Sequence, residues 1–123
     1  RLIRQLRPQM CEDGVTYRYK TGALFRDDIP ENFIKNCLNF GASEIHLKYD
    51  TCTKERISAI HDAGMRSMAW FRGPIGMLED VTLKYDDVGN EDEIMYEMIM
   101  ASGVQSLCCN RPDVLFRVID SPR

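Results

Sequence analysis

The sequence lacks features that several large classes of protein require. No apolar run in its 123 residues approaches the roughly 20 that cross a bilayer, so we expect no transmembrane segment. The opening RLIRQLRPQM has no apolar core of the kind found in signal peptides. Because the chain begins with Arg1 and not with Met, we expect it to be a piece of a longer protein.

An excess of basic residues is also missing. Sixteen Lys and Arg stand against 19 Asp and Glu, which gives a net charge of −3. A protein that binds nucleic acid through its phosphates needs a basic surface that releases counterions. We therefore expect no nucleic acid among its partners. The hydrophobic share of 44% is ordinary for a globular protein and argues against disorder.

The cysteines form no recognisable framework. There are five, an odd number, and no CxxC pair has the spacing of zinc ligands. Cys37 lies in a helical pattern and Cys108 and Cys109 lie in a strand-like one, which fits small buried thiols. Reduced cysteines weakly favour a reducing compartment such as the cytoplasm, and the sequence leaves the location otherwise open.

Strand-like and helix-like segments alternate along the chain. Strands are predicted over residues 15–20 (VTYRYK), 43–49 (SEIHLKY), 65–71 (MRSMAWF) and 104–109 (VQSLCC). Helices are predicted over residues 30–41, 54–63, 90–103 and 114–119. The alternation is typical of βα units.

Capping residues and glycines mark the predicted ends of these helices. Thr53 is the predicted N-cap of the second helix, and Asn90 that of the third, with Glu93 in capping-box register. Glycine follows the first three helices, at Gly41, Gly64 and Gly103, where a left-handed conformation is needed. The third helix is expected to bury a stripe of Ile94, Met95, Met98 and Ile99.

Strands joined by helices imply parallel pairing with right-handed crossovers. A (β/α)8 barrel takes about 250 residues, so this chain has room for about four of its units. The predicted fold is therefore α/β, a single partial domain (residues 1–123) forming half of a TIM barrel. Half a barrel exposes its inner face and two edges. Self-association, or pairing with a missing N-terminal half, is expected to cover them. The alternative is a complete flavodoxin-like domain, although GxGxxG is absent.

Two stretches carry a family resemblance. One is GASEI at 41–45 with SAIHDAGMRSMAWF at 58–71, and the other is ASGVQSLCCNRPDVL at 101–115. Together they resemble the late strands and the C-terminal signature of glycerophosphodiester phosphodiesterases, in which a helix ending His-x-x-Gly feeds a strand that finishes on tryptophan. The matching region runs from about residue 41 to 118. The resemblance implies that the chain is the C-terminal half of such a barrel.

The departures from that family are specific. The family's Trp-Thr-Val-Asn is replaced here by Trp70-Phe71-Arg72-Gly73, and its Asp-Gly by Gln105-Ser106. The family's catalytic His-Arg-Gly, Glu-x-Asp and second histidine lie in the first half of its barrel and have no counterpart here. No catalytic residue and no metal ligand is therefore assigned, and the chain alone is predicted to be inactive.

The resemblance also implies a reaction. The parent would be a phosphoric diester hydrolase of lipid metabolism that cleaves glycerophosphodiesters to glycerol phosphate and an alcohol, with a divalent cation (Mg or Ca) held elsewhere. The alternative is a non-catalytic barrel relative, or a half-barrel, that acts as a structural or interaction module. The lost Trp-Thr-Val-Asn and the absent catalytic set favour this second hypothesis.

Three residues are predicted to line the substrate side. By resemblance, Trp70 packs against the glycerol moiety, with a core aromatic as the alternative. Arg72 could face a phosphate through its planar donor fork, with a surface arginine in a loop as the alternative. Lys48 alternates with apolar residues and could point into a barrel, where its ammonium needs an anion, either a substrate phosphate or Glu44. The alternative is a solvated or helix-covered lysine. Lys20 has the same ambiguity at the end of its predicted strand.

The remaining polar candidates are given structural roles. His46 and His61 are interpreted as structural histidines. Asn110 is expected to bond the backbone of its own turn in an Asx-type arrangement. The acids of residues 91–93 are expected to interact with a helix dipole and not with a metal ion.

Overall fold

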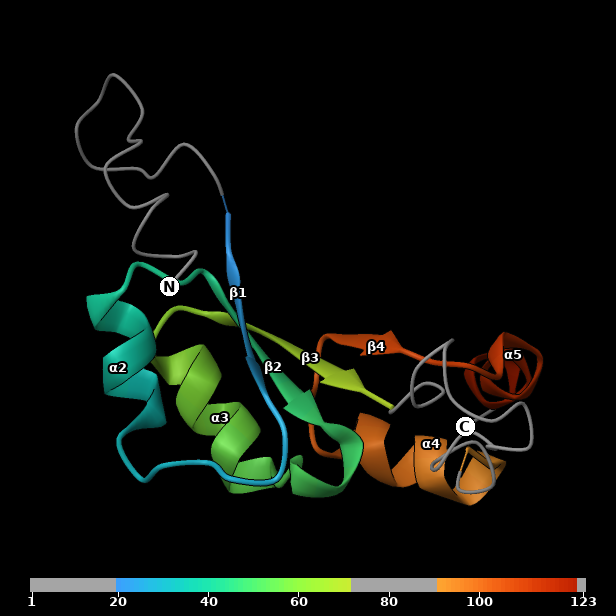
Figure 1. The fold of residues 1–123 in the computed structure, drawn as a ribbon. Coiled ribbons are helices and arrows are strands. Elements are labelled where there is room, and N and C mark those ends of the chain that lie inside the picture. The colour runs from blue at the N-terminus through green and yellow to red at the C-terminus, as the bar shows by residue number, and fades with distance from the viewer. Residues whose placement is uncertain (1–19, 72–90, 122–123) are drawn as a thin grey trace, which may run out of the picture.

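The computed structural model describes residues 20–71 and 91–121, in which strands and helices alternate (Figure 1). The strands are β1 (Gly22–Phe25), β2 (Glu44–Lys48), β3 (Arg66–Trp70) and β4 (Ser106–Cys108). The α-helices are α2 (Phe33–Asn39), α3 (Lys54–Asp62), α4 (Glu93–Ala101) and α5 (Pro112–Asp120), and a short 3-10 helix, η1 (Tyr49–Thr51), follows β2. None of the described helices is long and apolar enough to span a membrane.

The sheet is parallel, and its spatial order β1-β2-β3-β4 is the order of the sequence. Each connection therefore steps to the next strand in the same direction. A doubly wound, flavodoxin-like sheet reverses its strand order part-way, and no reversal occurs among the described strands. The predicted fold class, parallel βα units resembling half of a TIM barrel, is confirmed.

The helices cover one face of this sheet. Ile45, Leu47 and Ala69 point toward them and are fully buried. One apolar cluster joins β2 to α2 and α3, and a second joins β3 to α4 and α5. In Figure 1, α2 and α3 accordingly lie together on one side of the strands. The core of the described protein lies between this face and the helices.

We call the opposite side of the sheet the open face. Its side chains come from alternate strand residues, namely Leu24, Glu44, His46, Lys48, Arg66, Met68, Trp70, Ser106 and Cys108. None of them belongs to either apolar cluster. Leu24 remains 64% exposed. No described helix packs on this face.

The predicted helix boundaries are partly confirmed. The Thr53 side chain accepts a hydrogen bond from the Arg56 N–H at 3.2 Å and caps α3. Gly41, Gly64 and Gly103 all have a positive φ, from 77° to 89°, and follow α2, α3 and α4. These left-handed turns return the chain to the sheet after each helix.

The first βα unit differs from the prediction. Residues 15–19 of the predicted strand lie outside the described residues, and Lys20 is exposed before β1, not at the end of a strand. Strand β1, which was not predicted, lies further along the chain. Helix α2 begins at Phe33, three residues after Pro30, and the residues between them form a turn in which the Phe33 N–H donates to the Pro30 carbonyl.

The start of α4 also corrects the prediction. Asn90 lies outside the described residues, and the N-cap is Asp92, whose carboxylate accepts the Met95 N–H at 2.8 Å. The predicted apolar stripe was wrong in part. Ile94 and Met98 are 69% and 64% exposed, whereas the buried residues of α4 are Tyr96 and Ile99.

Candidate functional site

Parallel strands bring their carboxyl ends to one edge of a sheet, where barrel enzymes place their chemistry. Here β1, β2 and β3 end at Phe25, Lys48 and Trp70. Lys48 and Trp70 are cross-strand partners in the β2–β3 register. The edge therefore brings together two of the three predicted substrate-side residues, while Arg72 lies outside the described residues.

Lys48 is held by two carboxylates. Its side chain is 14% exposed, and Nζ lies 3.1 Å from Asp27 Oδ1 and 3.5 Å from Asp50 Oδ2. Nζ also lies 5.8 Å from the centre of the Tyr49 ring. Glu44, the predicted protein partner, is not used, because it lies four residues earlier in the same strand, about 13 Å away at 3.3 Å per residue.

Trp70 lies on the open face between Lys48 and Cys108, its register partners on the neighbouring strands. Its indole N–H donates to the Phe25 carbonyl at 3.2 Å, across the end of β2. This bond fixes the orientation of the ring, and the side chain is only partly buried. An oriented aromatic surface thus lies beside an ammonium group at the carboxyl edge.

A second polar group lies on the open face, further from this edge. His46 Nε2 is 2.9 Å from Glu44 Oε2, and Arg66 Nε is 3.7 Å from Glu44 Oε1. The imidazole packs on Gly22, where an added Cβ would lie 2.5 Å from a ring carbon. Only glycine leaves room for this ring. Glu44 and Gly22 therefore hold the His46 ring in place on this face.

His61 is on the helix-covered side. Its Nε2 is 2.8 Å from the hydroxyl oxygen of Ser67, a residue only 2% exposed. The same oxygen accepts the Gln105 N–H at 3.2 Å. Ser67 is buried whereas His61 is only partly buried, and the pair links α3 to β3.

Glu91 was predicted to interact with a helix dipole, but its carboxylate is instead buried and hydrogen-bonded. It is 2% exposed, and its carboxylate accepts three hydrogen bonds: from the Tyr96 hydroxyl at 2.8 Å, from the Asn110 N–H at 2.6 Å, and from the Asn110 side-chain amide at 2.9 Å. Burial and the bond to Glu91 raise the pKa of Tyr96. The predicted Asx-type role of Asn110 was wrong, because its side chain turns to Glu91 and the residue two positions on, Pro112, has no N–H.

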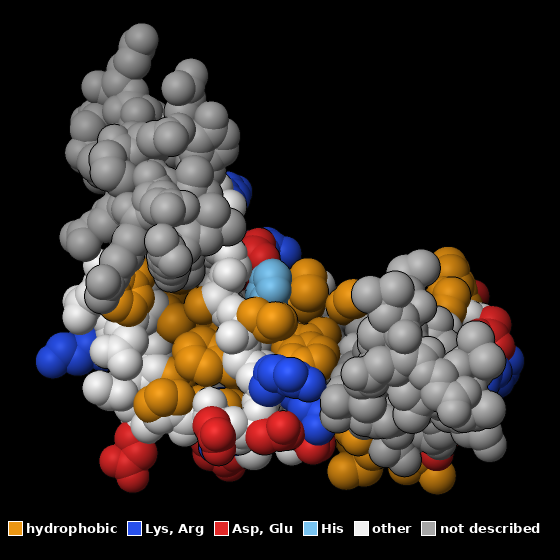
Figure 2. Space-filling view, in the orientation of Figure 1, with side chains coloured by type: hydrophobic (Ala, Val, Ile, Leu, Met, Phe, Trp, Pro, Cys, Tyr) orange, Lys and Arg blue, Asp and Glu red, His pale blue; other side chains and the backbone are white. Residues whose placement is uncertain are grey.

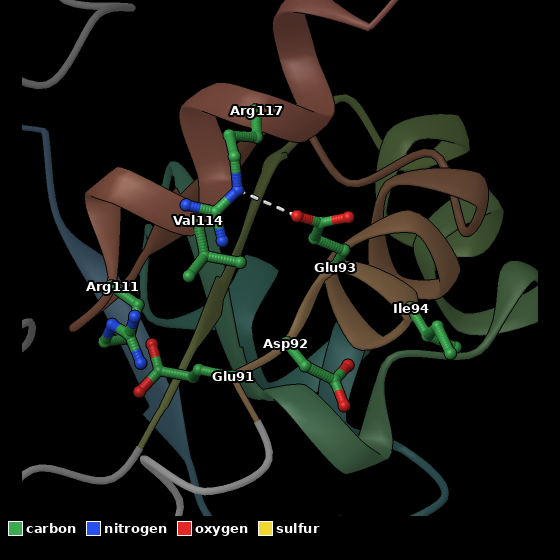
Figure 3. A pocket seen from close by; sticks show the side chains of 7 residues that line it. All are labelled: Glu91, Asp92, Glu93, Ile94, Arg111, Val114 and Arg117. Carbon is green, nitrogen blue, oxygen red and sulfur yellow. Dashed lines mark hydrogen bonds and ion pairs between the residues drawn. The ribbon is translucent and has the colours of Figure 1, made fainter.

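Beside Glu91 is a pocket of about 490 Å³ between the starts of α4 and α5 (Figure 3). Its two arginines are already paired, Arg117 with Glu93 at 2.8 Å and Arg111 with Asp113 at 2.9 Å. The Arg111 guanidinium lowers the pKa of Asp113 to about 2. We assign no ligand to this pocket.

The described cysteines, Cys37, Cys52, Cys108 and Cys109, are free thiols. Burial, reinforced by the Asp50 carboxylate, raises the pKa of Cys52 to about 11. Burial also raises the pKa of Cys37 and of Cys109. These three thiols stay protonated at neutral pH and are poor nucleophiles.

The described residues contain few candidate metal ligands near one another. Within residues 20–71 and 91–121, no group of three or more His, Cys, Asp or Glu lies close enough together to hold a metal ion. The two carboxylates nearest the carboxyl edge, Asp27 and Asp50, bracket an ammonium instead. The described residues therefore do not fit a divalent cation.

Comparison with known proteins shows similarity to a solved structure but not to a family model or a curated sequence. No family model and no curated protein matches the sequence. Among solved structures, the chain is similar to the crystal structure of a putative glycerophosphodiester phosphodiesterase from Galdieria sulphuraria, with a TM-score of 0.63 and 18% sequence identity. The match covers 83% of this chain and 36% of that protein. The chain therefore shares the fold of a segment that makes up about a third of that protein.

Proposed function

We propose that this chain is one arc of a barrel that hydrolyses phosphoric diesters, cleaving glycerophosphodiesters to glycerol phosphate and an alcohol. One observation carries the proposal. Lys48 and Trp70 lie in register on neighbouring strands at the carboxyl edge of a barrel-like sheet. A glycerophosphodiester offers an anionic phosphate beside an apolar carbon chain, and an ammonium beside an aromatic ring is complementary to both. The similarity to the Galdieria protein supports this choice of substrate class.

In this proposal the chain binds and orients the substrate. Trp70 packs against the glycerol carbons, and its bond to the Phe25 carbonyl holds the ring in place. Lys48 attracts the phosphate, assisted by Arg72, two residues beyond Trp70. Proton transfer and any divalent cation, Mg or Ca, belong to parts of the parent barrel other than the residues described. The isolated chain is accordingly expected to bind but not to hydrolyse.

The test is a titration of the purified chain with glycerol 3-phosphate and with glycerophosphocholine. Trp70 is the only tryptophan, so its indole signal in NMR reports the site directly. We expect saturable shifts with the wild-type chain, and shifts at least tenfold weaker with Lys48→Gln. Lys35→Gln, at an exposed position on α2, is the matched control and should bind as the wild type does. Saturation unaffected by Lys48→Gln would contradict the assigned role of the lysine.

A second candidate function rests on a different observation. Both Asp27 and Asp50 already neutralise Lys48, so a phosphate must compete with two carboxylates. That arrangement suits a non-catalytic barrel relative acting as a structural or interaction module. The absence of any indole shift at millimolar glycerol 3-phosphate and low ionic strength would favour this module. A His-Arg-Gly followed by Glu-x-Asp upstream of Arg1 in the parent transcript would favour the enzyme.

A further inference from the structure

Two carboxylates lie beside the Lys48 ammonium at the carboxyl edge of the sheet. Nζ is 3.1 Å from Asp27 Oδ1 and 3.5 Å from Asp50 Oδ2. The lysine side chain is 14% exposed, whereas those of the two aspartates are 72% and 47% exposed. Figure 2 shows acidic side chains next to basic ones below the histidine, in the part of the view where β1 and β2 end in Figure 1. A phosphate that contacts Lys48 therefore lies near two exposed carboxylates.

The stability of the fold accounts for little of this arrangement. Exposed ion pairs stabilise a protein weakly, because solvent screens their charges and ordering two side chains costs entropy. One aspartate would already give Lys48 a counter-ion. With the second, the group of Lys48, Asp27 and Asp50 carries a charge of −1. This surplus acts on any charged ligand that contacts the lysine.

The proposed reaction changes the charge of the phosphate. A phosphoric diester carries one negative charge at neutral pH. Hydrolysis takes up water, breaks one P–O bond and releases the alcohol and a proton, so the monoester product carries close to two negative charges. Coulomb energy is proportional to the charge of the ligand, so each carboxylate repels the product about twice as strongly as the substrate.

We propose that Asp27 and Asp50 are specificity-determining residues, which prevent the Lys48 site from preferring a phosphoric monoester to a diester. The inference rests on the proposed function, because it takes the phosphate to lie against Lys48. A lysine alone would bind the doubly charged product more tightly than the substrate, and the product would then occupy the site. The two carboxylates offset this advantage, and the product is released.

The geometry sets the size of the effect. A phosphate oxygen bonded to Nζ on the side away from the carboxylates would lie about 6 Å from each of them. At that separation in water, one carboxylate weakens binding about two- to threefold for each unit of ligand charge. The monoester carries one unit more than the diester. Removing both carboxylates should therefore shift the ratio of the two affinities about five- to tenfold, whatever other charges lie nearby.

The test is an NMR titration of the Trp70 indole with glycerol 3-phosphate and with its methyl diester, which differ by one methyl group and one charge. It is run at pH 8 and low ionic strength, where the monoester is doubly charged and screening is weak. Wild type should bind the diester at least as tightly as the monoester. Asp27→Asn/Asp50→Asn should bind both more tightly and prefer the monoester about fivefold or more. Each single variant should shift the ratio about two- to threefold.

Asparagine keeps the size of the aspartate and a carbonyl oxygen for Nζ, and both positions are exposed, so these variants should fold. The matched control is Asp62→Asn, which removes one exposed carboxylate as each single variant does. Asp62 ends α3 just before β3 begins, at the opposite edge of the sheet from Lys48. The control should leave the ratio of the two affinities unchanged.

The ratio separates a role in specificity from a merely structural one, which would change both affinities by the same factor. A ratio that is equal in wild type and the double variant would overturn the inference and leave the proposed function standing. So would a wild-type preference for the monoester, or a shift of the ratio as large in Asp62→Asn as in Asp27→Asn. The absence of saturable shifts with both ligands in every variant would overturn the inference and the proposed function together.

Discussion

The helix-covered face and the open face use alternate residues of the same strands, yet they are stabilised by different means. On the covered face, Ile45 and Leu47 are fully buried in apolar contact. On the open face, their neighbours Glu44, His46 and Lys48 are satisfied by ion pairs and hydrogen bonds. The comparison shows how a single sheet can have one face stabilised by apolar packing and another stabilised by pairs of polar side chains.

Truncating one side chain on each face to alanine should give the largest difference in unfolding free energy. Ile45→Ala removes a fully buried side chain and should cost about 3–4 kcal/mol of unfolding free energy. Leu24→Ala on the open face should cost less than about 1 kcal/mol in the monomer, because its side chain is mostly in water. Urea denaturation at the lowest workable protein concentration measures both. Equal costs would show that the open face is already covered.

The second effect tests whether polar pairing can stabilise as strongly as apolar packing. Glu91→Ala leaves the Tyr96 hydroxyl and two Asn110 donors without their acceptor and should cost about 3 kcal/mol. Glu93→Ala removes only an exposed pair with Arg117 and should cost at most about 0.5–1 kcal/mol. Similar values for the two variants in urea denaturation would mean that Glu91 is not buried as the structure has it.

Raising the pH above 10 should reduce the contribution of Tyr96 and its bond to Glu91 to the stability of the fold. Burial and the bond to Glu91 raise the pKa of Tyr96, so the folded chain keeps this proton above pH 10, where an unfolded tyrosine loses it. The contribution of Tyr96 is complete below pH 10 and falls by up to about 1.4 kcal/mol per pH unit above it. Thermal unfolding between pH 8 and pH 11 measures this loss. Tyr96→Phe should flatten the alkaline decline, and an unchanged slope would contradict the assignment.

The smallest effect concerns the packing of the open face itself. Gly22→Ala places a methyl group 2.5 Å from the His46 ring, which must then leave Glu44, at a cost of about 1 kcal/mol. In the background of His46→Ala the same glycine substitution should be nearly neutral. A double-mutant cycle measures this coupling. Additive costs would show that the ring does not rest on the glycine.

The sequence predicts those parts of the fold that depend on neighbouring residues. The Thr53 cap and the three glycines that end helices act within a few positions of the chain, so their residue types are informative. Strand β1 was missed because Gly22 and Ala23 have little intrinsic preference for strands. The strand is held by pairing with β2, and just before it the Thr21 backbone and Ser43 exchange hydrogen bonds.

The candidate site was predictable in position but not in its contacts. Alternation in β2 places Lys48 on the inward side at the end of a strand. One of its two carboxylate partners is distant in the sequence, however: Asp27 lies 21 residues earlier. Glu91 and Asn110 are 19 residues apart, and no local pattern pairs them. The one available signal was the run of three acids at residues 91–93, of which only Asp92 is needed as a cap.

The hydrogen bonds of Glu91 to Tyr96 and Asn110 also affect how readily the two edge strands of the sheet open. They fasten the residues just before α4 to the residue that follows β4 by two positions. Strand β4 cannot fray from that end without exposing a buried carboxylate and its donors, whereas among the described residues β1 is tied at its ends by neutral hydrogen bonds only, between Thr21 and Ser43 and from Trp70 to the Phe25 carbonyl. Transient opening should therefore begin at β1, and its amide protons should exchange with solvent sooner than those of β4, even though β4 is the shorter strand.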